Sequence, residues 1–114
     1  MRRSSSHREF LTPAATECIR NLGKQIRIAR KRRSLTQEEL AARASVGVTT
    51  VQRLERGDSV SLDILANILV AMNLEDTLDR VANPDEDEAG KALEYRRLPK
   101  RVREKLRHGL DTDF

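Results

Sequence analysis

The sequence is poor in cysteine and in aromatic residues. It contains one cysteine, Cys18, no tryptophan, one tyrosine and two phenylalanines. A single thiol can form neither an internal disulfide nor a cysteine-based metal site, so we expect a reducing, cytoplasmic compartment. Because aromatic side chains are so few, any hydrophobic core must be aliphatic and of modest size.

Long apolar runs are also absent. No stretch of about 18 apolar residues occurs, so we expect no membrane-spanning segment. The first 11 residues are basic and no apolar signal-peptide core follows them. We expect residues 1–11 to lack regular structure.

The residues that enzymes use are scarce. His7 and His108 lie near opposite ends of the chain, and Cys18 has no activating base near it in the sequence. Glycine-rich phosphate loops and clusters of metal ligands are not found, and the acids at residues 85–88 lack the ordered spacing of a calcium loop. We therefore predict a non-enzymatic protein with no catalytic residues, cofactor or metal.

The net charge of +4 conceals blocks of opposite sign. Residues 1–33 carry ten Lys or Arg and two Asp or Glu, and residues 34–57 carry three of each. Residues 58–94 carry two basic and ten acidic residues, and residues 95–114 carry seven basic and three acidic ones. Basic blocks of this kind indicate a polyanionic partner such as nucleic acid, but they also suit solvated helix faces. Charge alone leaves both interpretations open.

The first expected helix covers about residues 13–32. Thr12 can cap it, and Pro13 is tolerated in a first turn. Apolar residues then recur at steps of three and four along this stretch, which is the period of an α-helix. Gly23 weakens the helix and is a point where it could divide.

Two short helices follow with a tight break between them. Thr36 and Glu39 have the spacing of a capping box, which predicts a helix start. Gly47 can cap the next helix, expected over about residues 48–56, and Gly57 supplies a stop. This arrangement is typical of a helix-turn-helix.

A fourth helix, expected over about residues 62–72, is apolar on two faces. One face holds Leu62, Leu65, Ala66 and Leu69, and the other holds Ile64, Ile68 and Ala71. A helix apolar on two sides usually contacts two structures. We expect Ile64, Ile68 and Ala71 to form a dimer interface; the alternative is that residues 74–81 fold back and cover this face.

The second helix of the pair is suited to the DNA major groove. If Val51 and Leu54 face inward, the opposite side is polar and free to contact a partner. The residues expected to contact base edges are Val48, Thr49, Gln52 and Arg53. The residues expected to contact phosphates are Gln37, Thr50 and Arg56.

The stretch resembles the Cro/repressor-type helix-turn-helix family, also called the xenobiotic-response-element type. The matching elements are IR at 26–27, LTQEELA at 35–41, Val46, TV at 50–51 and RLERG at 53–57. The resemblance implies a lambda-repressor-like fold and a structural ion pair between Arg30 and Glu55. Two departures stand out: Ala44-Ser45 replaces the common Leu-Gly at the break, and Val48 is apolar where many members are polar.

Both ends of the chain add to this picture. Residues 83–90 are acidic and contain proline and glycine, which is typical of a linker, and residues 91–114 form a basic tail interrupted by Pro99. The overall order is similar to HipB-like regulators, which are antitoxins of HipA-like kinase toxins. The tail then has three interpretations: a partner-binding segment, a non-specific phosphate contact, or a nuclear import signal. Its basic residues of interest are Arg96, Arg97, Lys100, Arg101 and Arg103.

Together these features predict an all-α protein, a compact bundle of about five helices with flexible basic tails. The expected organisation is an unstructured segment at 1–11, a DNA-binding domain at 12–82, a linker at 83–90 and a tail at 91–114. We expect a homodimeric transcriptional repressor that binds a palindromic operator in double-stranded DNA at the nucleoid. The resemblance adds a HipA-like kinase as a partner. The alternatives are a free-standing regulator without a toxin and a module that chiefly neutralises a kinase.

Overall fold

The computed structural model describes residues 10–112, with side chains for residues 10–108. Residues 1–9 and 113–114 lie outside it, and with them most of the segment expected to be unstructured. Within the described range every regular element is helical, which confirms the all-α prediction. The elements are α2 (Pro13–Arg32), α3 (Gln37–Ala44), α4 (Val48–Glu55), α5 (Leu62–Ala71), α6 (Glu75–Asp79), the 3₁₀ helix η1 (Pro84–Glu86), α7 (Glu88–Arg97) and α8 (Lys100–Thr112).

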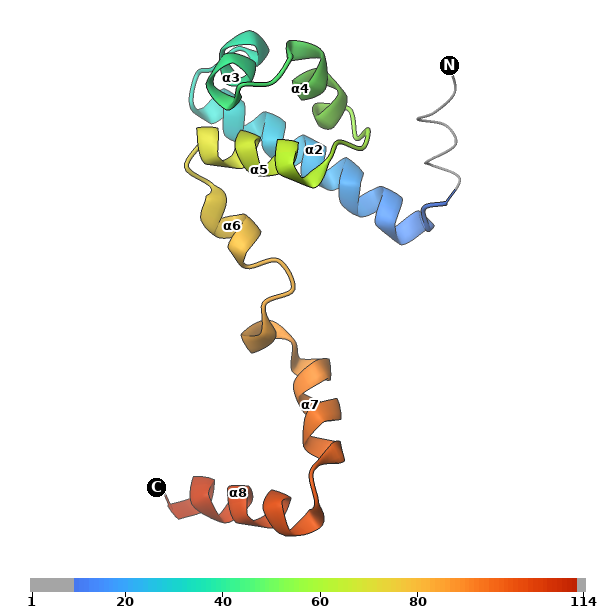
Figure 1. Cartoon of the computed structure of the whole chain (residues 1–114), viewed down its shortest axis with the longest axis vertical. Coiled ribbons are helices and arrows are strands. Elements are labelled where there is room, and N and C mark those ends of the chain that lie inside the picture. Colours follow the sequence, from blue (N-terminus) through green and yellow to red (C-terminus); the bar gives the residue numbers. More distant parts are fainter. Residues whose placement is uncertain (1–9, 113–114) are drawn as a thin grey trace. The chain divides into compact units, whose positions relative to one another are not determined.

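The chain divides into two compact units, residues 1–78 and residues 79–114. The first unit contains α2 to α5 and nearly all of α6, and the second contains η1, α7 and α8 (Figure 1). The sequence analysis expected the domain to end at residue 82, and the first unit ends at residue 78. No helix among the described residues has both the length and the hydropathy needed to cross a membrane.

The helix starts follow the capping residues of the sequence. The Thr12 hydroxyl accepts a hydrogen bond from the Ala15 N–H at 3.1 Å, ahead of Pro13 in the first turn of α2. At α3 the capping box is complete: the Glu39 N–H donates to the Thr36 hydroxyl at 3.0 Å, and the Thr36 N–H donates to the Glu39 carboxylate at 2.8 Å. These bonds satisfy N–H groups that a helix start leaves unpaired.

The turn between α3 and α4 has the geometry of a helix-turn-helix. Ser45 ends α3 in the left-handed conformation, with φ of 58°, and Gly47 begins α4 in an extended conformation. Gly57, which follows the end of α4, also has a positive φ, of 89°. A left-handed residue at the end of a helix redirects the chain within one or two residues. This turn therefore forms although serine occupies the position where the resemblance expects glycine.

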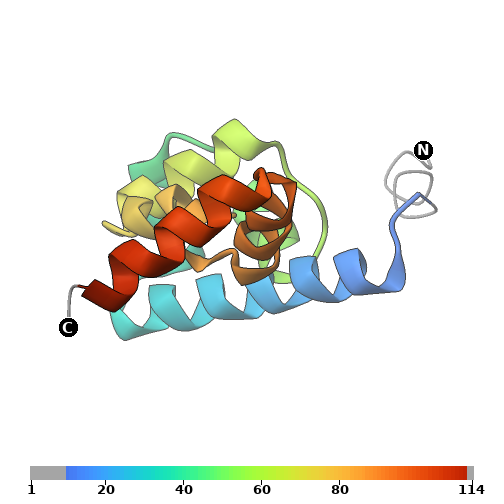
Figure 2. The ribbon, with the colours of Figure 1, turned by 90° about the horizontal axis from the view of Figure 1, so that it is seen from below.

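Helix α2 is continuous through Gly23, which confirms the single helix expected over residues 13–32 (Figure 2). Gly23 is buried, and a Cβ atom built on it would lie 2.3 Å from the carbonyl oxygen of Leu54. The glycine is needed because α2 passes close to the last turn of α4, where even a methyl group has no room.

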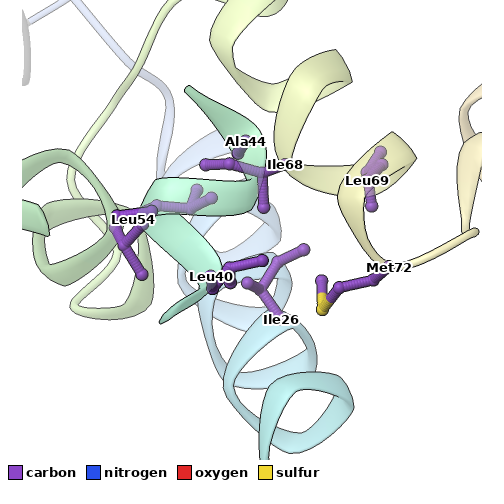
Figure 3. Close-up of a cluster of buried hydrophobic side chains, with 9 residues drawn as sticks. Ile26, Leu40, Ala44, Leu54, Ile68, Leu69 and Met72 are labelled. Carbon is purple, nitrogen blue, oxygen red and sulfur yellow. The ribbon is translucent and has the colours of Figure 1, made fainter. Parts of the chain in front are cut away.

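The core of the first unit is aliphatic, as the composition predicted (Figure 3). Helix α3 packs against both α4 and α5, and α2 packs against α4. Full burial of one such side chain is worth about 1.5–3 kcal/mol relative to exposure, so this cluster holds the short helices in place. Its members are Ile26, Leu40, Ala41, Ala44, Val51, Leu54, Ile68, Leu69 and Met72.

Helix α5 differs from its expected orientation. Ile68 is fully buried, at 0% exposed, inside the core of its own chain, so the structure does not place it where a second copy could contact it. Ile64 and Ala71 are partly buried against the same cluster. Leu74 and Leu78 also pack on it, which favours the alternative that the segment after α5 folds back. The exposed apolar residues of α5 are instead Leu62 and Val70.

The second unit is helical where a flexible linker and tail were expected. The acids of residues 84–86 lie in η1, and α7 begins at Glu88, with the Asp87 carboxylate accepting a hydrogen bond from the Gly90 N–H at 2.9 Å. Pro99 separates α7 from α8, as predicted for an interruption. The Tyr95 hydroxyl donates to the Arg103 carbonyl at 3.3 Å, and the Arg103 guanidinium lies 5.9 Å from the centre of the Tyr95 ring. These contacts join the two helices.

Candidate nucleic-acid interface

Helix α4 has one buried face and one accessible face. Val51 and Leu54 are 0% and 1% exposed and anchor the helix to the core. On the other side Thr49 is exposed, and Gln52 and Arg53 are half-buried. The structure therefore brings Thr49, Gln52 and Arg53 to one accessible face, as the residue spacing predicted.

Val48 and Thr50 flank this face. Val48 is partly buried and packs against the core cluster, so its side chain is not turned fully outward as expected. Its place in the first turn of α4 means that apolar contact with the core competes with contact to a partner. Thr50 is half-buried at the edge of the same helix.

Arg53, in α4, and Arg56, just after it, make only weak contacts with the loop that follows. The Arg53 Nη2 atom donates to the Ser59 carbonyl at 3.4 Å, and Arg56 lies 3.7 Å from the Asp58 carboxylate. The Arg56 side chain is 66% exposed, and exposed ion pairs contribute about 0–1 kcal/mol. Both side chains can therefore exchange these contacts for contacts to an anionic partner at small cost.

Behind this face lies an almost completely buried ion pair between α2 and α4. The Arg30 Nε and Nη2 atoms donate to the two Glu55 carboxylate oxygens at 2.7 and 2.9 Å, and the side chains are 9% and 4% exposed. Arg30 Nη1 also donates to the Leu35 carbonyl at 2.9 Å. The pair implied by the family resemblance is thus present, in the two-pronged geometry that arginine and a carboxylate favour.

Glu55 also positions Gln37, which sequence reasoning did not foresee. The Gln37 Nε2 atom donates to the Glu55 carboxylate at 3.1 Å. Burial by itself raises the pKa of Glu55, but the hydrogen bonds from Arg30 and Gln37 and the charges of Arg30 and Arg27 outweigh it, so the pKa is lowered. The hydrogen bond to Glu55 raises the pKa of Arg30. Both groups therefore stay charged near neutral pH.

A wide hollow of about 680 Å³ opens beside this network. It lies between α2, the start of α3 and the accessible side of α4. Its lining carries three arginines against one glutamate, so its formal charge is positive. The polar residues that line it include Arg27, Thr36, Gln37, Gln52 and Arg56.

Arg27 is a site residue that the sequence predictions did not assign. It lines the hollow and its charge acts on Glu55. The available signal was the row of basic residues at steps of three and four along α2, which contains Arg20, Lys24, Arg27 and Lys31. That row could not show which member faces α3 and α4, because the crossing of the helices decides this.

Comparison with known proteins agrees with this geometry. Residues 26–77 match a family model described as helix-turn-helix. The match supports a helix-turn-helix of the Cro/repressor type in this part of the chain, and with it a DNA-binding transcriptional regulator. Among curated proteins, none matches the sequence.

Proposed function

We propose that the protein is a sequence-specific transcriptional repressor that binds double-stranded DNA through α4. One observation carries the proposal: the core fixes α4 so that a polar face stands beside a positively charged hollow. A helix held in this way fits the major groove of B-DNA.

The residue roles follow from the positions of the side chains. Thr49, Gln52 and Arg53 contact base edges, with Val48 at the margin of the same face. Gln37, Thr50 and Arg56 contact phosphates and set the orientation of α4 on the duplex. The hydrogen bond from Gln37 to Glu55 supports the role of Gln37, because it limits the directions in which the amide can point.

A homodimer completes the proposal. Two copies would place two recognition helices about 34 Å apart, one turn of DNA, so the operator would be palindromic. The exposed side chains of Leu62 and Val70 on α5 support a surface of contact between copies. Autoregulation of its own operon is the simplest use of such a repressor.

The test compares two arginines that differ in role. Arg53→Ala should weaken binding to the selected duplex by about 1–3 kcal/mol and relax base preference at one position. Arg56→Ala should weaken binding to all sequences alike and reduce the salt slope by about one. Binding would be measured on a duplex selected by the full chain from a random pool and on random duplex, over a range of salt.

Arg80→Ala is the matched control, since Arg80 is exposed and lies outside the residues 26–77 that match the family model. It should leave base preference unchanged. If Arg53→Ala and Arg56→Ala behaved identically on selected and random DNA, the assigned roles would be wrong.

A second candidate function is control of a HipA-like kinase. The observation in its favour is that residues 79–114 form a compact unit of their own, with Leu93 and Leu106 exposed. A folded unit with free apolar side chains is suited to a protein partner. In this case DNA binding by the first unit and kinase binding by the second would be separate tasks.

A further inference from the structure

In the second unit, acidic residues come first along the chain and basic residues follow. Its first part, residues 79–94, holds six acidic residues and two basic ones. Its second part, from residue 96 to residue 107, holds seven basic residues and one acidic residue, Glu104. The end of α7 and the first two turns of α8 therefore form a strongly cationic region.

Most of these cations have no acidic partner. Among the described side chains of this unit, the one ion pair joins Lys91 to Glu88 at 3.3 Å, outside the cationic region. Arg103 packs on the ring of Tyr95. The remaining cations are exposed and are not within ion-pair distance of any described acid; they are Arg96, Arg97, Lys100, Arg101, Lys105 and Arg107. We call these six residues the basic face.

The basic face is carried on ordered helices. The contacts between Tyr95 and Arg103 join the end of α7 to the start of α8. Arg101 and Lys105 lie one helical turn apart on one side of α8, and Val102 and Leu106 lie on the side next to it. Like charges at this spacing repel and destabilise a helix by a few tenths of a kcal/mol per pair. An anionic partner would remove that repulsion.

We propose that the basic face binds the phosphate backbone of the same DNA duplex that α4 recognises. This inference rests on the proposed function. Phosphate contacts add affinity without reading sequence. Because the second unit is linked to the first by the chain, its binding is intramolecular once α4 is in place, and a weak contact is then effective. The basic face acts as a second electrostatic clamp, and α4 alone determines base preference.

The composition of the unit favours DNA over an anionic membrane. Helices that bind membrane surfaces place Trp, Phe and Leu in the apolar layer. Residues 79–112 contain no Trp or Phe, and the single tyrosine, Tyr95, is engaged with Arg103. The large exposed leucines of this unit are Leu93 and Leu106. The six exposed cations of the basic face outnumber them, which favours a polyanion over an apolar layer.

The experiment uses the full chain with Arg101→Gln and Lys105→Gln combined. Glutamine retains helix propensity, and far-UV circular dichroism would check helix content. The log of affinity falls with the log of salt by about 0.9 per phosphate neutralised, so losing two contacts should reduce the slope by nearly two. Between ~50 and ~200 mM salt, the variant should lose about tenfold less affinity than the wild type. Affinity at low salt should fall equally on selected and random duplex, with base preference unchanged.

Two controls keep the result specific. Lys91→Gln removes one charge from a cation that is already paired with Glu88, so it should change the slope little. Glu104→Gln removes the acid within the basic face and should strengthen binding to both duplexes.

Three results would overturn the proposal. The first is an unchanged slope in the double variant while Arg53→Ala still relaxes base preference, which would leave the function of α4 intact. The second is an unchanged slope with loss of binding to phosphatidylserine vesicles, which would assign the basic face to membranes. The third is that the wild-type chain binds no duplex, in which case the proposed function has also failed.

Discussion

At the scale of single residues, the Glu55 carboxylate connects two parts of the proposed DNA-binding surface. It accepts hydrogen bonds from Arg30 on α2 and from Gln37 at the start of α3, while its own backbone belongs to the end of α4. One carboxylate therefore fixes three helices relative to one another. Loss of one partner of such a buried pair leaves a charge without compensation, which is strongly unfavourable.

This arrangement predicts that stability depends on pH. The pKa of Glu55 is lower in the folded chain than its ordinary value, so the pair stabilises the fold above the ordinary pKa of glutamate. That stability is lost as the pH falls through the lowered folded-state pKa. Glu55→Gln should cost about 2–3 kcal/mol at neutral pH, and the difference from the wild type should shrink below about pH 4.

Urea unfolding of both proteins across this pH range is the measurement. Glu17→Gln serves as the control, because the Glu17 side chain is 55% exposed and its ion pair with Arg20 is a surface one. A difference between Glu55→Gln and the wild type that stayed constant from neutral to acid pH would show that the glutamate charge is not what stabilises the fold.

Sequence reasoning reached some of these residues and not others. The resemblance implied Arg30 and Glu55, and helical spacing indicated the outward positions of Thr49, Gln52 and Arg53. The bond between Gln37 and Glu55 joins residues 18 apart in the sequence, so no local pattern reveals it. Val48 was misjudged in part because an apolar side chain next to a core can pack inward, and spacing alone does not decide this.

At the scale of elements, capping residues predicted the helix starts well. Thr12, Thr36 and Gly47 all begin helices where they were expected to. The break after α3 also has left-handed geometry with serine in place of glycine, a conformation that a few per cent of residues other than glycine adopt. The hydrogen bonds and backbone angles at a helix end depend on a few neighbouring residues, which is why these boundaries could be predicted.

Gly23 shows the opposite case, because helix propensity alone predicts the wrong sign for the stability change of Gly23→Ala. In an isolated helix, Gly→Ala stabilises by about 1 kcal/mol. Here the added Cβ would lie 2.3 Å from the Leu54 carbonyl oxygen and 3.0 Å from that of Glu55. Both are backbone atoms of α4 and cannot rotate away. Gly23→Ala should therefore destabilise the domain by about 1–3 kcal/mol, the usual cost of overpacking.

Thermal unfolding would measure this effect. Asn21→Ala, an exposed change on the same helix, is the control and should leave the melting temperature equal or slightly higher. Because the clash displaces α4, the Gly23 variant should also bind selected duplex less tightly. A melting temperature raised by Gly23→Ala would mean that α2 and α4 do not approach as closely as described.

At the scale of the whole molecule, the first unit was largely predictable and the second was not. The apolar spacing of α2 to α5 and the family resemblance both act within the first unit. The sequence analysis placed Ile68 of α5 on the wrong side, at a dimer interface. Helix α5 is apolar on several sides, and only the packing of the whole domain decides which side is buried. For residues 88–112, charge and Pro99 indicated a tail, while helix-forming residues and the contact between Tyr95 and Arg103 produce two helices.

The division into units predicts that the first one is stable alone. The core cluster and the residues packed on it all lie between residues 22 and 78, so a chain ending at residue 82 keeps every one of them. Its melting temperature should lie within about 4 °C of the full chain, equivalent to less than about 1 kcal/mol. Base preference should be unchanged, but the salt dependence of DNA binding should weaken because the basic face is gone.

If the second candidate function holds, a kinase should co-purify with the full chain and not with the shortened one. A shortened chain that unfolds at a much lower temperature would instead show that the second unit stabilises the first.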